Sequence, residues 1–151
     1  MLQSTVKNVM SLGSAGTVLY GLHSFYNSVV RRASGTDIKV GCFVQQATAE
    51  NEVVMASGKA ITKPIVGVVV KDKLINSNVN TDIVKDGSDI TVMNEGTILI
   101  ETTNSSAAQG KYVFLKDSDG SLAFGDTAVL ADHTFTGFIV EIGNSNTGKS
   151  V

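Results

Sequence analysis

The sequence has a single cysteine, Cys42, a single proline, Pro64, and no tryptophan. One cysteine excludes an intrachain disulfide and a cysteine metal cluster. Because Cys42 lies in an apolar run, we expect it to be a small buried hydrophobic side chain and not a nucleophile. A chain of 151 residues needs no such cross-link, since it buries roughly 70% of its unfolded surface as one domain.

Charge is also scarce. Only 17% of the residues are charged, against about a quarter in an average soluble protein. The net charge of −2 argues against nucleic acid or a membrane surface as partner. Apolar stretches are too short to span a bilayer, and the first 21 residues lack the apolar core of a secretory signal, so cytoplasmic synthesis is expected. A charge-poor surface suits a protein packed against partners, but also any polar-surfaced β domain.

What the chain does contain is a repeat. Residues 41–44 (Gly-Cys-Phe-Val) are similar to residues 110–113 (Gly-Lys-Tyr-Val), and the glycine-centred run 65–70 is similar to the run 135–140. The spacing between the two glycines of each copy differs by one residue. Because two segments match in order, we interpret the repeat as structural. The alternative is chance reuse of Gly-x-aromatic-Val by β strands.

From residue 36 onward the sequence predicts an all-β fold. Short runs rich in Val, Ile, Thr and Phe are bounded by turn-forming residues, and the turns at 94–96 and 117–120 are expected to close hairpins. Many short strands with regular turns favour a barrel or a sandwich. The expected strands are 40–46, 53–56, 65–70, 90–93, 97–101, 112–116, 122–124 and 135–142.

The first 35 residues differ in composition from the rest. They hold both arginines, two of the three tyrosines and no acidic residue. We interpret residues 1–35 as an extended N-terminal arm that packs on its own domain or on a neighbour; the alternative is an ordinary first strand pair. A β domain (36–142) and a flexible polar tail (143–151) follow. The expected interface residues are Tyr20, Phe25, Tyr26, Arg31 and Arg32.

The adjacent Arg31 and Arg32 stand at the end of this predicted arm. Guanidinium groups bind carboxylates in a bidentate fork and tolerate burial in interfaces better than ammonium groups do. The pair could therefore clamp acidic residues of a partner. The alternative, to which we give equal weight, is that both arginines are solvated at the end of the arm and bind no partner.

Three motifs suggest chemistry, and each has a plainer explanation. Residues 143–150 match the phosphate-binding pattern G-x-x-x-x-G-K-[ST], but that site needs a helix that begins at the lysine and serine, and only Val151 follows the motif. Residues 117–120 resemble a calcium loop without its later ligands. His23 and His133 stand far apart, with no metal or triad pattern around them. The sequence predicts no catalytic residue, no metal and no cofactor, and hence not an enzyme.

The order of motifs resembles that of the structural cement, or decoration, proteins of tailed bacteriophage capsids. The resemblance covers residues 10–142: a polar arm, a Gly-x-aromatic-Val strand, a glycine-centred apolar run, the 90–98 hairpin, a second Gly-x-Tyr-Val and a final Thr-Gly-Phe-Ile-Val. It implies a compact β-barrel or β-tulip-like domain. It also implies a homo-oligomer, dimer or trimer, on the outside of the virion head, with the arm reaching over major capsid protein subunits. The family has no catalytic residues to carry over.

The function expected from this resemblance is that of a capsid cement protein that bridges neighbouring major capsid subunits on the assembled head. Such a protein stabilises the shell because it binds the assembly and not the free subunits. The alternative is a β module of a phage tail or baseplate that binds protein or glycan. A small trimeric nucleotide hydrolase is a third class, for which the sequence lacks a cluster of acidic or basic residues.

Overall fold

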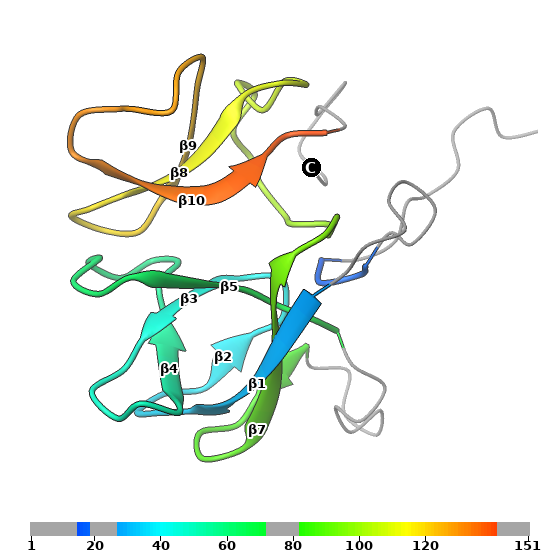
Figure 1. Ribbon diagram of the computed structural model, residues 1–151, viewed down its shortest axis with the longest axis vertical. Coiled ribbons are helices and arrows are strands. Elements are labelled where there is room, and N and C mark those ends of the chain that lie inside the picture. Colours follow the sequence, from blue (N-terminus) through cyan, green and yellow to red (C-terminus); the bar gives the residue numbers. More distant parts are fainter. Residues whose placement is uncertain (1–14, 19–26, 72–81, 142–151) are drawn as a thin grey trace, which may run out of the picture.

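A closed five-stranded barrel dominates the computed structural model, which describes residues 15–18, 27–71 and 82–141 (Figure 1). The barrel order is β1-β4-β3-β5-β7. All its neighbours are antiparallel except β1 and β4, which are parallel. Its strands are β1 (Asn27–Ala33), β3 (Phe43–Gln46), β4 (Glu52–Met55), β5 (Ile65–Val69) and β7 (Asp89–Glu95).

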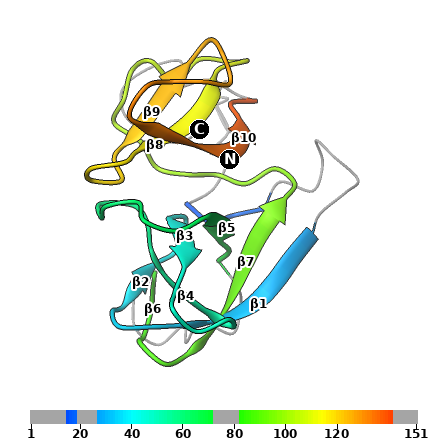
Figure 2. The ribbon, with the colours of Figure 1, turned by 60° about the vertical axis from the view of Figure 1, so that its left-hand side comes forward.

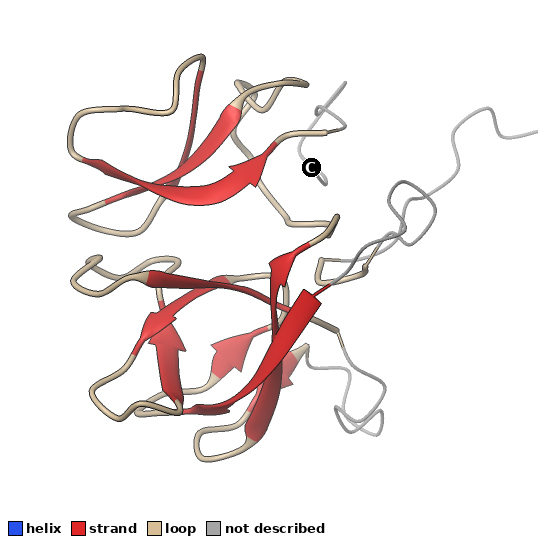
Figure 3. Ribbon diagram, viewed as in Figure 1, coloured by secondary structure: helices blue, strands red, loops and turns tan. Residues whose placement is uncertain are grey.

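The C-terminal part of the chain forms a separate sheet above the barrel. It contains β8 (Tyr112–Lys116), β9 (Leu122–Gly125) and β10 (His133–Ile139) in the order β10-β8-β9. A third sheet pairs the short strands β2 (Ile38–Lys39) and β6 (Ile83–Val84). The described residues contain strands and loops but no helix (Figure 3). The predicted all-β fold with a compact barrel is therefore confirmed.

The C-terminal sheet is stacked on one end of the barrel (Figure 2). Two hydrophobic cores hold these sheets together, one inside the barrel and one between the barrel and the C-terminal sheet. They meet at β3, where successive side chains point to opposite faces of a strand. Val44 belongs to the barrel core and Phe43 to the core beneath the C-terminal sheet. Phe43 also meets Phe138 of β10 edge to face, with ring centroids 5.8 Å apart. The barrel wall is thus buried on both sides at this point.

The predicted boundary of the arm needs correction. Asn27–Ala33, assigned to the arm from its composition, forms β1 and closes the barrel between β4 and β7. Residues 15–18 also contact the domain, since the Gly16 amide donates to the carbonyl of Leu99 and Val18 forms a bridge with Ile98. The rest of the predicted arm, residues 1–14 and 19–26, lies outside the described residues.

The hairpin expected after residues 94–96 is also wrong. Thr97–Glu101 does not continue as a strand; Ile98, Leu99 and Ile100 are buried in succession in the link between β7 and the C-terminal sheet. Its backbone bonds to residues 16–18 rather than folding back on β7: Ile98 forms a bridge with Val18, and the Leu99 amide donates to the Thr17 carbonyl. The hairpin at 117–120 is confirmed, because β8 and β9 pair across it.

The repeat is structural. In each copy the first strand is central and the second and third strands flank it, giving β4-β3-β5 and β9-β8-β10. The backbone pairing also matches: the Gly41 amide donates to Val69, and the Gly110 amide to Val140. We call β3–β5 the first repeat and β8–β10 the second repeat.

Candidate interaction surface

The second repeat has one face on the core and one face turned away from the barrel. Along β8, Val113 and Leu115 enter the core beneath the sheet, so Tyr112 and Phe114 lie on the opposite side. Cross-strand pairing places further residues on that side, because directly opposed residues share a face. We call this surface the outer face; its residues are Tyr112, Phe114, Ala123, Phe135 and Ile139.

Aromatic rings form the centre of the outer face. The ring centroid of Phe135 lies 5.5 Å from that of Tyr112, edge to face, and 5.6 Å from that of Phe114, in a tilted arrangement. Aromatic pairs favour such geometries over a face-to-face stack. Phe135 is 37% exposed and Ile139 54% exposed. Large apolar side chains exposed together on one sheet are typical of a contact surface rather than of a solvated face.

The loop between β9 and β10 completes this surface. Because β9 and β10 run in the same direction on either side of β8, residues 126–132 must pass from one end of the sheet to the other. They do so on the side away from the barrel (Figures 1 and 2). Gly125, at the start of this crossover, packs against the Phe114 ring, which is buried. Val129, in the crossover, is 82% exposed.

The arginines predicted to form an interface lie on β1 of the barrel. Neighbouring strand residues point to opposite faces, so Arg31 and Arg32 do not form one side-by-side clamp. Arg31 is half-buried, and its Nε has no hydrogen-bond partner among the described residues. Arg32 is exposed, its Nε donates to the Gly87 carbonyl, and Glu52 and Asp89 stand opposite it on the two adjacent strands.

The aromatic members of that predicted interface, Tyr20, Phe25 and Tyr26, lie outside the described residues. The outer face was not among the predicted sites. Its alternation, Tyr112 and Phe114 against Val113 and Leu115, is present in the sequence. However, both sets are apolar, so the sequence pattern could not tell which set faces the core.

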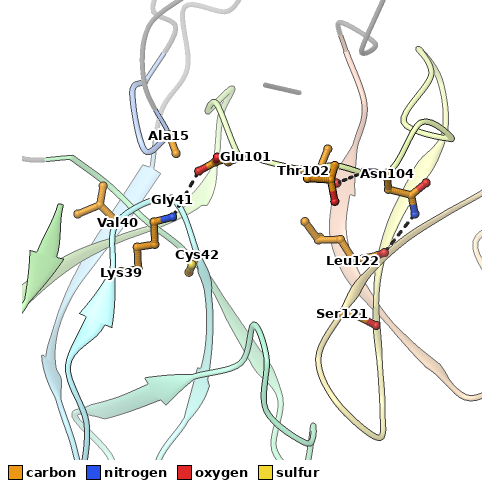
Figure 4. Close-up of a pocket in the computed structure, with 11 residues that line it drawn as sticks. Ala15, Lys39, Val40, Gly41, Cys42, Glu101, Thr102, Asn104, Ser121 and Leu122 are labelled. Carbon is orange, nitrogen blue, oxygen red and sulfur yellow. Dashed lines mark hydrogen bonds and ion pairs between the residues drawn. The ribbon is translucent and has the colours of Figure 1, made fainter. Parts of the chain in front are cut away.

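A pocket of about 490 Å³ opens at the seam between the barrel and the C-terminal sheet (Figure 4). Its polar groups are largely paired with one another. Lys39 Nζ lies 3.3 Å from a Glu101 carboxylate oxygen, and the Asn104 side chain bonds the Leu122 carbonyl and the Ser106 amide. The pocket therefore lies where the barrel and the C-terminal sheet contact each other, and its paired polar groups do not indicate a ligand site.

Cys42 lines the same pocket and is half-buried. Burial raises the pKa of its thiol, against smaller opposing contributions from Lys39 and Ser57. A raised pKa leaves little thiolate at neutral pH, and the thiolate is the nucleophile. The arrangement thus fits a packing role for Cys42.

The acidic turn at 117–120 is built by its own hydrogen bonds. The Ser121 hydroxyl, and after it the Ser121 amide at 2.9 Å, lower the pKa of the Asp119 carboxyl by hydrogen bonding to it. Asp117 accepts from the Thr134 hydroxyl at 2.6 Å. In the part of the chain that the structure describes, no group of three or more metal-ligating side chains gathers.

His133 contacts the Ala131 carbonyl through Nδ1, whereas His23 and the motif at 143–150 lie outside the described residues. No described helix is long and apolar enough to cross a membrane.

A barrel with a β sheet packed on its wall, paired polar groups and an exposed apolar face defines a structural, interaction-making domain. Comparison with known proteins places it more closely: residues 2–150 match the family described as structural cement protein (E217 gp24/Pam3 gp6), and the chain belongs to that family. A chain in a solved structure, "The capsid of Myoviridae Phage XM1", shares the fold with a TM-score of 0.62 and 15% identity, over 99% of this chain and 95% of that one. No curated protein sequence matches.

Proposed function

We propose that this protein binds the outer surface of an assembled bacteriophage head and bridges neighbouring major capsid protein subunits as a homo-oligomer. The observation that carries the proposal is the family match, which covers residues 2–150. A capsid structural role follows from the family; the bridging, the exterior position and the synthesis in the bacterial host cytoplasm are our extension of it. The role requires surface and shape, and no catalytic step.

The architecture is suited to this role. In the closed barrel every strand is paired on both sides, so this part of the molecule has no free strand edge for indiscriminate strand addition. The two cores bury the barrel wall on both sides and fix the position of the C-terminal sheet. A rigid body of this kind loses little conformational entropy on binding, which preserves more of the interface energy for affinity.

The exposed side of β1 supports a capsid contact at the barrel end of the molecule. Val30 and Arg32, two residues apart, share that side, and Val30 is 65% exposed. Exposed aliphatic surface beside a guanidinium group is a common composition for protein interfaces. We include Tyr20, Phe25, Tyr26 and Arg32 in the proposed capsid-binding set, whereas Arg31 is half-buried on the opposite face of β1.

The test is co-sedimentation of the purified protein with expanded heads that lack it, alongside isolated tails or baseplates. We expect the protein to pellet with heads and to saturate at a fixed ratio to the major capsid protein. Saturated heads should also resist heat to a higher temperature, because a ligand that binds only the assembled state stabilises that state. Binding to tails but not to heads would replace this proposal with the tail-module function.

A further inference from the structure

The two repeats share a strand pattern but differ in what lies beside their third strand. In both, a crossover loop joins the second strand to the third: residues 56–64 in the first repeat and 126–132 in the second. The first repeat continues sideways into the barrel, because β7 pairs with the other edge of β5. In the second repeat, β10 takes the place of β5 but lies at the edge of its sheet. No described strand pairs with its other side.

Matching glycines show this difference in detail. Gly67 of β5 and Gly137 of β10 hold the same place in the repeat and have positive φ angles, and both strands pair with the central strand in an irregular register. A Cβ on Gly67 would lie 2.1 Å from the Met93 carbonyl oxygen, so this glycine allows the β7 backbone to approach. A Cβ on Gly137 would meet nothing within 4 Å among the described residues. The edge of β10 therefore offers the same space for a strand backbone.

This edge lacks the features that usually protect an exposed strand. Native proteins block such edges with charged residues, with proline or by keeping the strand short. β10 is seven residues long and contains no Asp, Glu, Lys, Arg or Pro. Its irregular register is no obstacle, because β5 has a similar irregularity and still pairs with β7. β9, at the other edge of the sheet, is only four residues long, and its Leu122 carbonyl accepts from the Asn104 side chain.

The geometry defines the chemistry of a strand that would fit. A strand that pairs with β10 as β7 pairs with β5 runs antiparallel to it. Because directly opposed residues share a face, its outward side chains would lie beside Phe135 and Ile139, which are exposed and apolar. Its inward side chains would adjoin the core that contains Val140. The occupant is therefore an extended segment with apolar side chains on both faces, as in β7, whose Val92 and Met93 enter different cores.

We propose that the free edge of β10 binds an extended segment of the major capsid protein as an added antiparallel strand. Added strands gain affinity from main-chain hydrogen bonds and specificity from alternate side chains. A second β10 fits less well, since it would bring its own irregular register, whereas β7 meets β5 without a register shift. Residues 143–150 are rich in Gly and Asn, which strands disfavour. The inference rests on the proposed function and names the kind of contact made there.

The experiment follows amide hydrogen exchange of the full-length protein, free and bound to heads that lack it. We expect the β10 amides that point to the free edge to exchange rapidly in the free protein. On saturated heads their exchange should slow at least about tenfold, because hydrogen bonds to the added strand protect them. The amides of β8 are the internal reference. They should be protected in both states, because β8 is paired on both sides.

Gly137→Ala tests the space beside the strand. The variant should fold, because the added Cβ meets no described atom. It should bind heads at least about tenfold more weakly, because the methyl group would meet the incoming backbone as a Cβ on Gly67 would meet β7. Gly110→Ala is the matched control and should bind as wild type. Gly110 also has a positive φ and open space around it, but its amide donates to Val140 from the β8 side.

Circular dichroism verifies that both variants are folded, and the exchange data on wild type decide the question if Gly137→Ala is not. Edge amides of β10 that are already protected in the free protein would overturn the inference. The occupant would then be a second copy if the protection is lost on dilution, and another part of the same chain if it is not. Edge amides that stay unprotected on saturated heads, or equal head binding by the two variants, would overturn the inference and leave the capsid function intact. A wild type that fails to pellet with heads would refute both.

Discussion

At the scale of single residues, matching glycines of the two repeats have unequal constraints. Gly67 and Gly137 both have positive φ angles, 154° and 87°, within strands that pair with the central strand of their repeat. A Cβ on Gly67 would lie 2.1 Å from the Met93 carbonyl oxygen, because β7 pairs with β5 there. Gly137 is on β10 at the edge of its sheet and has open space around it.

We predict that Gly67→Ala destabilises the protein by about 2–4 kcal/mol, since a backbone carbonyl must move to admit the methyl group. Gly137→Ala should cost only about 1 kcal/mol, the strain of a left-handed conformation without a clash. Urea unfolding followed by circular dichroism measures both. Equal losses for the two variants would show that the glycines serve backbone conformation alone and that the close approach of β7 is unimportant.

Cys42 provides a second test at this scale. Its raised thiol pKa, caused mainly by burial, predicts that a disulfide reagent reacts with the folded protein much more slowly than with a free cysteine at the same pH. The rate should rise as the pH approaches the raised pKa and should reach the free-thiol rate in urea. Fast reaction in the folded state at neutral pH would mean that the seam pocket opens and that Cys42 is not held by packing.

At the scale of elements, β1 shows why the arm boundary was misjudged from the sequence. Its residues, Asn27–Ala33, include two arginines and no acidic residue, a composition that matches the segment before it better than the domain after it. The signal for a strand was weak because Val29 and Val30 are adjacent rather than alternating. Long-range pairing with β4 and β7 decides the outcome, and neither partner can be recognised from residues 27–33 alone.

Two truncations test this assignment. Removal of residues 1–14 should leave the barrel intact, with a cooperative thermal transition, because the described contacts begin at Ala15. Removal of residues 1–35 takes away β1, which pairs with both β4 and β7, and should abolish cooperative unfolding. The shorter truncation is the control for the longer one. A folded protein without residues 1–35 would show that β1 is dispensable and would restore the original boundary.

At the scale of the whole molecule, the repeat was the feature that the sequence predicted best. The glycine positions and apolar runs predicted the bounds of β3, β5, β8 and β10 to within a few residues. They did so because turn-forming residues flank each of these strands. The short strands β2 and β6 were missed, since two residues have no period to detect. The packing of one repeat on the other could not be predicted either. It depends on which face of β8 meets the barrel, and both faces are apolar.

At the same scale, the exposed side of β1 is the surface through which the molecule is proposed to contact the capsid. Arg32 is exposed, whereas Arg31 is half-buried on the opposite face of the strand, so the two should separate in function. Arg32→Ala should weaken head binding by about 2–5 kcal/mol if its guanidinium is buried against a capsid carboxylate, and Arg32→Lys should restore only part of it, because ammonium lacks the bidentate fork. Arg31→Ala should mainly lower the free energy of unfolding.

Co-sedimentation with heads that lack the protein measures the Arg32 variants, and urea unfolding measures the Arg31 variant. Lys63→Ala is the matched control, because Lys63 is an exposed cation on the barrel, in the crossover of the first repeat. Loss of an exposed charge alone changes binding by roughly 0–1 kcal/mol. If Arg32→Ala and Lys63→Ala reduce head binding equally, the exposed side of β1 lies outside the interface. The capsid contact must then be made elsewhere on the molecule.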